Sequence, residues 1–287
     1  MQEQENISCC EQTKENQIIH GVIWKQLLIF FFPIVLGTFF QQIYNTADAI
    51  VVGRFVGTEA LAAVGGSTSQ IINLIVGFFV GLSSGATVVI SQYYGAKEKE
   101  GLQNALHTAF AFSVLGSILI SVIGIVASPV LLRLMNTTPD VIEPSTAYLR
   151  IYFAGILFVF IYNVGSGILR AVGDSKRPLY YLIVCCIINI ILDIVFVVGF
   201  DMGVAGAAIA TVFAQGVSAV LVTAALCRST DIFRLTLKKI RIHKDALELL
   251  LKIGLPAGLQ SVMYSFSNII IQTSLNSFGT ETMAAWT

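Results

Sequence analysis

Charged residues are scarce in this sequence of 287 residues. Asp, Glu, Lys and Arg make up only 12% of it, about half of the roughly 25% that is usual in soluble proteins. Hydrophobic residues make up 55%. A soluble protein of this length needs more polar surface than so few charges provide. The composition therefore excludes a water-soluble domain and predicts a membrane protein.

Net charge is also absent, since Lys+Arg and Asp+Glu number 17 each. Nothing in this balance favours a nucleic-acid partner. The five cysteines form no Cys-x-x-Cys pair, and adjacent cysteines bridge poorly, so we expect neither a disulfide framework nor a thiolate zinc site. The three histidines lie far apart without the spacing of metal ligands, and no Ser/His/Asp or Cys/His set is present. The sequence therefore predicts neither an enzyme nor a resident metal or cofactor.

Seven long apolar runs are present, with polar or turn-forming breaks between them. A hydrocarbon core about 30 Å thick requires roughly 20 helical residues to cross it. Runs this long and apolar are typical of helices and not of barrel strands. The sequence therefore predicts an all-α polytopic membrane protein with spans near Leu27–Val51, Leu61–Ile90, Ala105–Leu132, Tyr148–Leu169, Leu179–Phe200, Gly203–Leu226 and Leu249–Leu275.

Lys and Arg are distributed unequally between the two sides of these spans. With the N-terminus in the cytoplasm, 14 of the 17 cations lie on the inner side and only Arg54, Arg133 and Arg150 lie outside. Positive residues concentrate on the cytoplasmic side of membrane proteins. We therefore predict a multi-pass protein of the cell membrane with a cytoplasmic N-terminus.

The sequence contains an internal repeat. A shift of 223 places Pro33 on Pro256 and Asn45 on Asn268, and with one residue removed 57–63 matches 279–285 at five of seven positions. A repeat of six spans gives two copies that point the same way, a plan found in secondary transporters with the ligand site between the copies. The second copy stops at Thr287, so the chain is expected to be a fragment, or else to need a partner that completes the cavity.

This repeat gives a domain plan. We predict a cytoplasmic tail over 1–23, a six-helix lobe over 24–227, a cytoplasmic connector over 228–248, and the truncated start of a second lobe with the seventh helix over 249–287. The connector mixes apolar residues with cations. It either lies along the inner leaflet or simply joins the two halves.

Two carboxylates are predicted within the membrane. Of the 17 acids, only Asp48 and Asp193 fall well inside predicted spans. Asn189 lies one helical turn from Asp193 on the same face, and Thr211 lies at a similar depth. Intramembrane charge is costly and marks function by default. These oxygens suit an alkali cation, or the two carboxylates hold a proton, because burial and like charge disfavour two negative charges. The alternative is a structural hydrogen bond between helices.

Two spans contain proline, which removes a backbone hydrogen bond inside a helix. Pro256 predicts a static kink. Pro33 predicts a bend that changes during transport, because Asp48 lies on the same helix.

Four short motifs are similar to one family. The sequence resembles the MATE family (multidrug and toxic compound extrusion) from Trp24 to its end, through the motifs at 44–54, 167–174, 189–193 and 254–258. The resemblance implies an exporter of twelve helices in two six-helix lobes, of which this chain holds the first lobe and the seventh helix. Such exporters expel organic cations and other amphipathic compounds in exchange for Na+ or H+.

The resemblance also implies roles for individual residues. Four match the cation-coupling site: Asp48, Asn189, Asp193 and Thr211. Four match the lining of the adjoining substrate cavity: Gln41, Tyr44, Tyr148 and Asn163. The seventh helix lacks the acid that some members carry there, which favours coupling through the first lobe.

Two other functions remain open. A flippase for a lipid-linked precursor, from the same superfamily, would need several cations in its cavity to hold a pyrophosphate, and the first six spans have almost none at mid-membrane. A membrane scaffold that does not transport would use a half-length bundle as its complete form.

Overall fold

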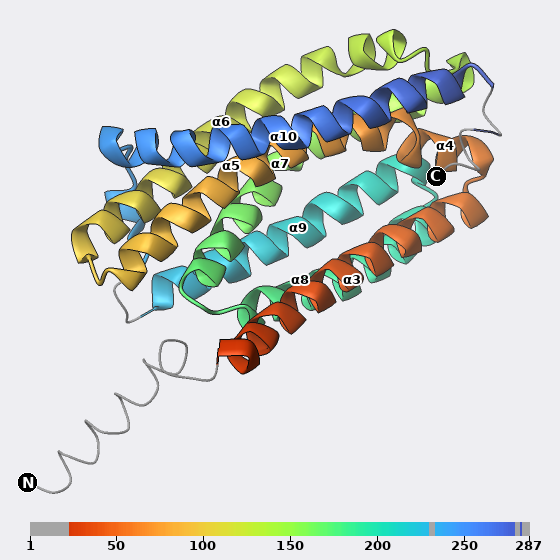
Figure 1. Cartoon of the computed structure of the whole chain (residues 1–287). Coiled ribbons are helices and arrows are strands. Elements are labelled where there is room, and N and C mark those ends of the chain that lie inside the picture. Colours follow the sequence, from red (N-terminus) through yellow and green to blue (C-terminus); the bar gives the residue numbers. More distant parts are fainter. Residues whose placement is uncertain (1–22, 230–232, 279–281, 283–287) are drawn as a thin grey trace, which may run out of the picture.

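A computed structural model of the protein describes residues 23–229, 233–278 and 282. Regular secondary structure in these residues is helical throughout (Figure 1). The predicted tail, apart from Ile23, and most of the second copy of the 57–63 motif lie outside the described residues. The elements in chain order are α3 (Ile23–Phe55), α4 (Thr58–Gly65), α5 (Ser67–Gly95), α6 (Lys99–Leu134), α7 (Pro139–Ala171), α8 (Lys176–Asp193), the π-helical η1 (Ile194–Gly199), α9 (Gly203–Arg228), the 3-10 turn η2 (Leu237–Lys239) and α10 (Lys244–Asn276).

The described part of the chain holds seven segments that are long and apolar enough to cross a membrane. Each of the seven predicted runs lies inside one of these segments to within one residue. The prediction of an all-α polytopic membrane protein is therefore confirmed, and the protein is a multi-pass membrane protein.

Two spans differ from uniform helices. The second is divided at Gly66, whose backbone (φ −69°, ψ −121°) separates α4 from α5. The fifth changes from an α-helix to the wider π-helix η1 directly after Asp193, and the Phe200 N–H donates to the Val195 carbonyl at 3.0 Å. Apolar residues continue through both irregularities, so hydropathy alone gives no signal for them.

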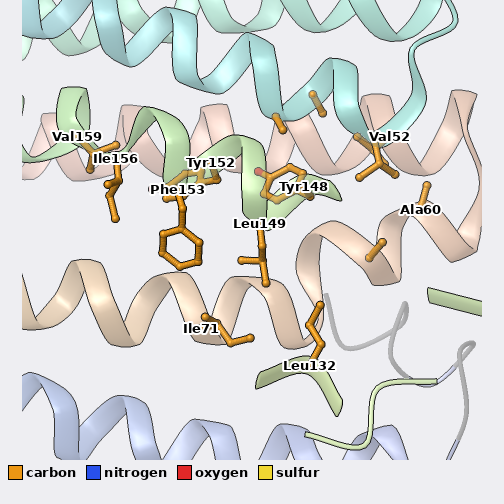
Figure 2. Close-up of a cluster of buried hydrophobic side chains, with 14 of the residues drawn as sticks. Val52, Ala60, Ile71, Leu132, Tyr148, Leu149, Tyr152, Phe153, Ile156 and Val159 are labelled. Carbon is orange, nitrogen blue, oxygen red and sulfur yellow. The ribbon is translucent and has the colours of Figure 1, made fainter. Parts of the chain in front are cut away.

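Helix α7 is the central element of the bundle, and α5, α6 and α9 pack around it. Helix α3 lies beside α8 on one side, and α10 lies along α5 on the other (Figure 1). Leu149 and Phe153 are fully buried and point from α7 toward α5, whereas Tyr148 and Tyr152 point away from α5 (Figure 2). One face of α7 therefore builds the core, while another presents aromatic side chains with hydroxyl groups.

The described part of the connector packs against the bundle. Phe233 and Leu235 are buried in a core cluster that includes residues of α6 and α9. The Thr236 N–H donates to Nε2 of the buried His107 at 3.2 Å, and Nδ1 of the same ring lies 2.7 Å from the Gln103 carbonyl oxygen. Phe233 and Leu235 are therefore covered by protein, and neither lies on a membrane surface.

Glycines allow α5 and α10 to approach closely. Gly81 lies against Gly258, and Gly85 lies against Gly254. A Cβ atom on Gly85 would lie only 2.5 Å from the Gly254 nitrogen, whereas one on Gly77 would meet nothing nearer than 3.7 Å. Small residues permit this type of backbone contact between membrane helices. The glycine stripe of the second span thus has the packing role that its spacing indicates.

We predict that Gly85→Ala destabilises the protein by about 1–3 kcal/mol, the usual cost of overpacking a filled interface. The added methyl group collides with backbone, which cannot rotate away. Unfolding in mixed detergent and sodium dodecyl sulfate, followed by circular dichroism, measures this difference. Gly77→Ala is the matched control and should leave the midpoint unchanged; equal midpoints for both variants would contradict the prediction.

Candidate functional site: a cavity beside two buried carboxylates

A cavity of about 580 Å³ lies inside the bundle. Residues of α3, α5, α7, α8 and α9 contribute most of its lining. Seven of the residues singled out in the sequence are among them: Pro33, Gln41, Tyr44, Asp48, Tyr148, Asn163 and Thr211. The first lobe therefore contains a space large enough for a small organic molecule.

Two carboxylates lie together at this cavity. Asp48 of α3 lines it and is 6% exposed, and Asp193 at the end of α8 is fully buried. The two side chains are close enough to interact with each other. Among the described residues, Oδ1 of Asp48 and both carboxylate oxygens of Asp193 have no hydrogen-bond donor. Buried polar atoms are nearly always paired, so these oxygens require a ligand or a proton.

Asn189 and Thr211 join the same cluster. Asn189 precedes Asp193 by one turn of α8, and its Nδ2 donates to the Thr211 hydroxyl at 3.4 Å. Within the described residues, the Asn189 Oδ1 has no donor either. The amide is thus turned so that its oxygen is free while its nitrogen is satisfied. The structure brings all four predicted coupling residues together, in a group rich in unpaired oxygens.

Aromatic side chains form the wall next to this cluster. The Tyr148 and Tyr152 rings lie nearly parallel, with centroids 6.4 Å apart and planes at 12°. Tyr44 is partly exposed and contacts Gln215. Ring faces attract organic cations. The wall therefore suits a flat or cationic ligand beside Asp48.

The other predicted residues occupy different surroundings. Asn163 is half-buried and donates from Nδ2 to the Val159 carbonyl at 2.8 Å, whereas Gln41 is exposed to the cavity. Pro33 is buried inside the continuous helix α3 and lines the cavity. Pro256 lies on an exposed face of α10 and does not line it. The two prolines that match in the repeat therefore differ in their relation to the site.

Several cavity residues were not singled out in the sequence. Tyr152 and Gln215 follow Tyr148 and Thr211 by one helical turn each, so helical spacing could have identified them. Arg170 was counted only as a cation near a membrane end, yet it lines the cavity together with Tyr162 and Asn73. No local pattern distinguishes a cation that faces lipid headgroups from one that faces a cavity.

The sequence comparisons agree with this architecture. The profile of the MatE family matches residues 33–195, which is more than half of the chain. The chain belongs to the MATE family. Over 272 residues it is 34% identical to the "Probable multidrug resistance protein YoeA" of Bacillus subtilis (strain 168). That match covers 92% of this chain but 58% of the relative, so the chain spans a little more than half of the relative's length.

Solved structures show the same MATE fold. An outward-facing conformation of a multidrug resistance MATE family transporter of the MOP superfamily superposes with a TM-score of 0.84 at 29% identity, covering 95% of this chain and 60% of that one. An inward-facing conformation gives a TM-score of 0.78 at 27% identity, covering 95% and 58%. The chain is thus a half-length piece of the MATE fold. These relatives are named as resistance proteins or transporters, which confirms the prediction of a transporter family and not an enzyme.

Neutralising one carboxylate of the pair should stabilise the fold. We predict that Asp193→Asn increases the free energy of unfolding by about 1–3 kcal/mol in sodium-free buffer at alkaline pH, because it removes a like charge and an unpaired buried acceptor. The gain should shrink in acid, where the wild-type carboxyls are protonated. Thermal melting in detergent measures both conditions.

The control for this experiment is Asp201→Asn. Asp201 is exposed and has a left-handed backbone (φ 53°), which asparagine tolerates well. A melting temperature that falls in Asp193→Asn, or rises equally in Asp201→Asn, would refute the proposed strain between the buried carboxylates.

Proposed function

We propose that the protein is a secondary antiporter that exports organic cations and other amphipathic compounds in exchange for inward Na+ or H+. The single observation that carries this proposal is the Asp48–Asp193 pair, whose unpartnered oxygens lie beside a cavity of about 580 Å³. The chain spans 58% of the length of the Bacillus subtilis relative, so the transport activity of the whole protein is part of this proposal.

The coupling follows from competition for one charged group. Asp48 belongs both to the carboxylate pair and to the cavity wall. A sodium ion or proton bound to the pair neutralises the charge that attracts an organic cation, so occupancy by either disfavours the other. A ligand shifts a conformational equilibrium only by its different affinity for the two states. Inward- and outward-facing states of similar transporters are the two arrangements that such binding would bias.

The lining supports cationic or amphipathic substrates. Asp48 is the one carboxylate among the described residues that line the cavity, and Tyr44, Tyr148 and Tyr152 lie near it. A carboxylate beside aromatic faces provides both Coulombic and cation–π attraction. The relative's designation as a multidrug resistance protein is consistent with a site of this kind.

We propose the cell membrane as the location, with the N-terminus in the cytoplasm. The supporting observation is the 14 to 3 distribution of Lys and Arg between the two sides of the spans. Export then moves the substrate from the end of the bundle that holds the connector to the opposite end.

The two alternative functions receive less support. A pyrophosphate-binding flippase needs several cations in the cavity, whereas Arg170 is the only Lys or Arg among the described lining residues. A scaffold requires neither an internal cavity nor two buried carboxylates without donors. The antiporter accounts for both.

Transport should depend on Asp193. In inverted membrane vesicles containing the product of the complete gene, we expect uptake of a fluorescent organic cation that is driven by a proton or a sodium gradient. Asp193→Asn should reduce this uptake to the rate without a gradient, because one oxygen ligand and one ionisable group are lost. The gradient that drives uptake identifies the coupling ion.

Asp201→Asn, an exposed acid outside the cavity, should keep full transport activity. Undiminished gradient-driven uptake by Asp193→Asn would remove the assignment of the coupling site. If the wild-type protein also shows no gradient-driven uptake, the proposed antiporter function is refuted.

Pro33 should act as a variable bend in α3. It lines the cavity on the same helix as Asp48, and proline leaves one carbonyl of the helix without its donor. Spin labels at the exposed positions Leu27 and Ile43 report the bend as a distance across Pro33. We expect this distance to change between acid and alkaline pH, and the change to be lost in Pro33→Ala. An identical distance at both pH values would leave Pro33 as a static kink.

A further inference from the structure

Arg170 lies at the far end of the cavity from the carboxylates. It is in the last turn of α7 and lines the cavity together with Tyr162, Ser166 and Ser175. Tyr148, near Asp48, lies 22 residues earlier on the same helix. At a rise of 1.5 Å per residue, the Cα atoms of Tyr148 and Arg170 are about 33 Å apart along α7. The cavity therefore has a carboxylate at one end and a guanidinium at the other.

In the part of the chain that the structure describes, no carboxylate pairs with this guanidinium. Asp174, the nearest acid in sequence, is engaged elsewhere: its Oδ2 pairs with Arg177 Nε at 3.0 Å, and its Oδ1 accepts from the Lys176 and Arg177 backbone N–H groups. Within residues 23–229 and 233–278, that pair is the one ion pair found, and the neighbouring group that acts on Arg170 is Tyr162. A half-buried cation with no anion is costly, so the site favours an anionic ligand.

Two hydroxyl groups beside Arg170 already donate hydrogen bonds within the protein, so they do not bind an anionic ligand as donors. The Tyr162 hydroxyl donates to the Pro178 carbonyl at 3.2 Å, and the Ser166 hydroxyl donates to the Asn163 carbonyl at 3.1 Å. Their hydrogens are thus used within the protein. The guanidinium retains a planar set of N–H donors, which matches the two oxygens of a carboxylate or phosphate.

We propose that Arg170 is a specificity-determining residue of this cavity, because its guanidinium binds the anionic group, a carboxylate or a phosphate, of ligands that carry one. This inference rests on the proposed export function and adds a residue that distinguishes ligands with an anionic group from ligands without one. Because Arg170 lies about 33 Å along α7 from Tyr148, which is near Asp48, Arg170 and Asp48 occupy different ends of one cavity. Arg170 lies at the end nearest the connector, where an exported substrate enters.

A pair of dyes tests this site. Rhodamine B carries a free carboxylate and a cationic ring system, and its ethyl ester is the same cation without the carboxylate. Fluorescence anisotropy measures the binding of each dye to the purified product of the complete gene, in maltoside detergent and without any ion gradient. We expect Arg170→Gln to weaken rhodamine B about ten-fold, the scale of a lost charged hydrogen bond, and to leave the ester within about two-fold.

Two further variants separate recognition from folding. Arg170→Lys keeps the charge but not the planar fork, and should weaken rhodamine B less than Arg170→Gln does. Lys176→Gln removes a nearby exposed cation that does not line the cavity and leaves the Asp174–Arg177 pair intact, so it should change neither dye. An equal loss for both dyes in Arg170→Gln, or no loss for either, would overturn the proposal.

The same binding measurements in lipid nanodiscs distinguish a soluble anionic substrate from a phospholipid phosphate at this site. If the preference for rhodamine B is present in maltoside and in phosphatidylcholine nanodiscs alike, a soluble substrate occupies the site. If it is present in maltoside and lost in nanodiscs, a phospholipid phosphate occupies it; both results support an anion site. These binding measurements need no ion gradient, so they are unaffected if Asp193 is not the coupling residue. Equally, if Arg170 does not bind an anion, the proposed antiporter function is not refuted.

Discussion

Asp48 and Asp193 place two carboxyl groups in the interior of the bundle, where Oδ1 of Asp48 and both oxygens of Asp193 have no hydrogen-bond donor among the described residues. An isolated charge in a membrane interior costs several kcal/mol, so Asp48 and Asp193 persist only if something offsets that cost. A bound cation or proton does so, and the free oxygen of Asn189 adds a further ligand. Under the proposed function, transport and stability oppose one another here, because the charge proposed to couple transport also destabilises the empty site.

The surrounding helices hold this pair in place. Asp193 ends α8, and the wider turn η1 begins at the next residue. A π-helical turn changes the direction in which the side chains around it point, and such turns are frequent at functional sites. Helix α7 supports the opposite wall. Leu149 and Phe153 point from α7 toward α5 (Figure 2), and Tyr148 and Tyr152 line the cavity. A packed core on one face thus positions a ligand wall on the other.

Site residues can be predicted from the sequence where residue type and helical spacing are sufficient evidence. Acids are rare in apolar spans, and Asn189 and Asp193 are one turn apart at a depth similar to that of Thr211. These local features predict a polar cluster with Asp48, and the structure places all four residues in one cluster. Arg170 shows the limit of such reasoning. In the sequence it is only one of the 14 cations on the inner side of the spans, but the rotation of α7 turns its side chain toward the cavity. That rotation is set by packing with α5, α6 and α9, which no window of sequence contains.

The membrane class, the seven spans, the family and the candidate acids can all be predicted from the amino-acid sequence. They follow from hydropathy, from short motifs and from the rarity of charge, which are properties of short stretches of the chain. The helix packing shows in addition which polar groups share one cavity, where the break at Gly66 and the turn after Asp193 fall, and that Gly81 and Gly85 contact α10. The physical reason is that transfer from water to lipid fixes where helices form, whereas their mutual rotation and contact come from close packing between segments far apart in the chain.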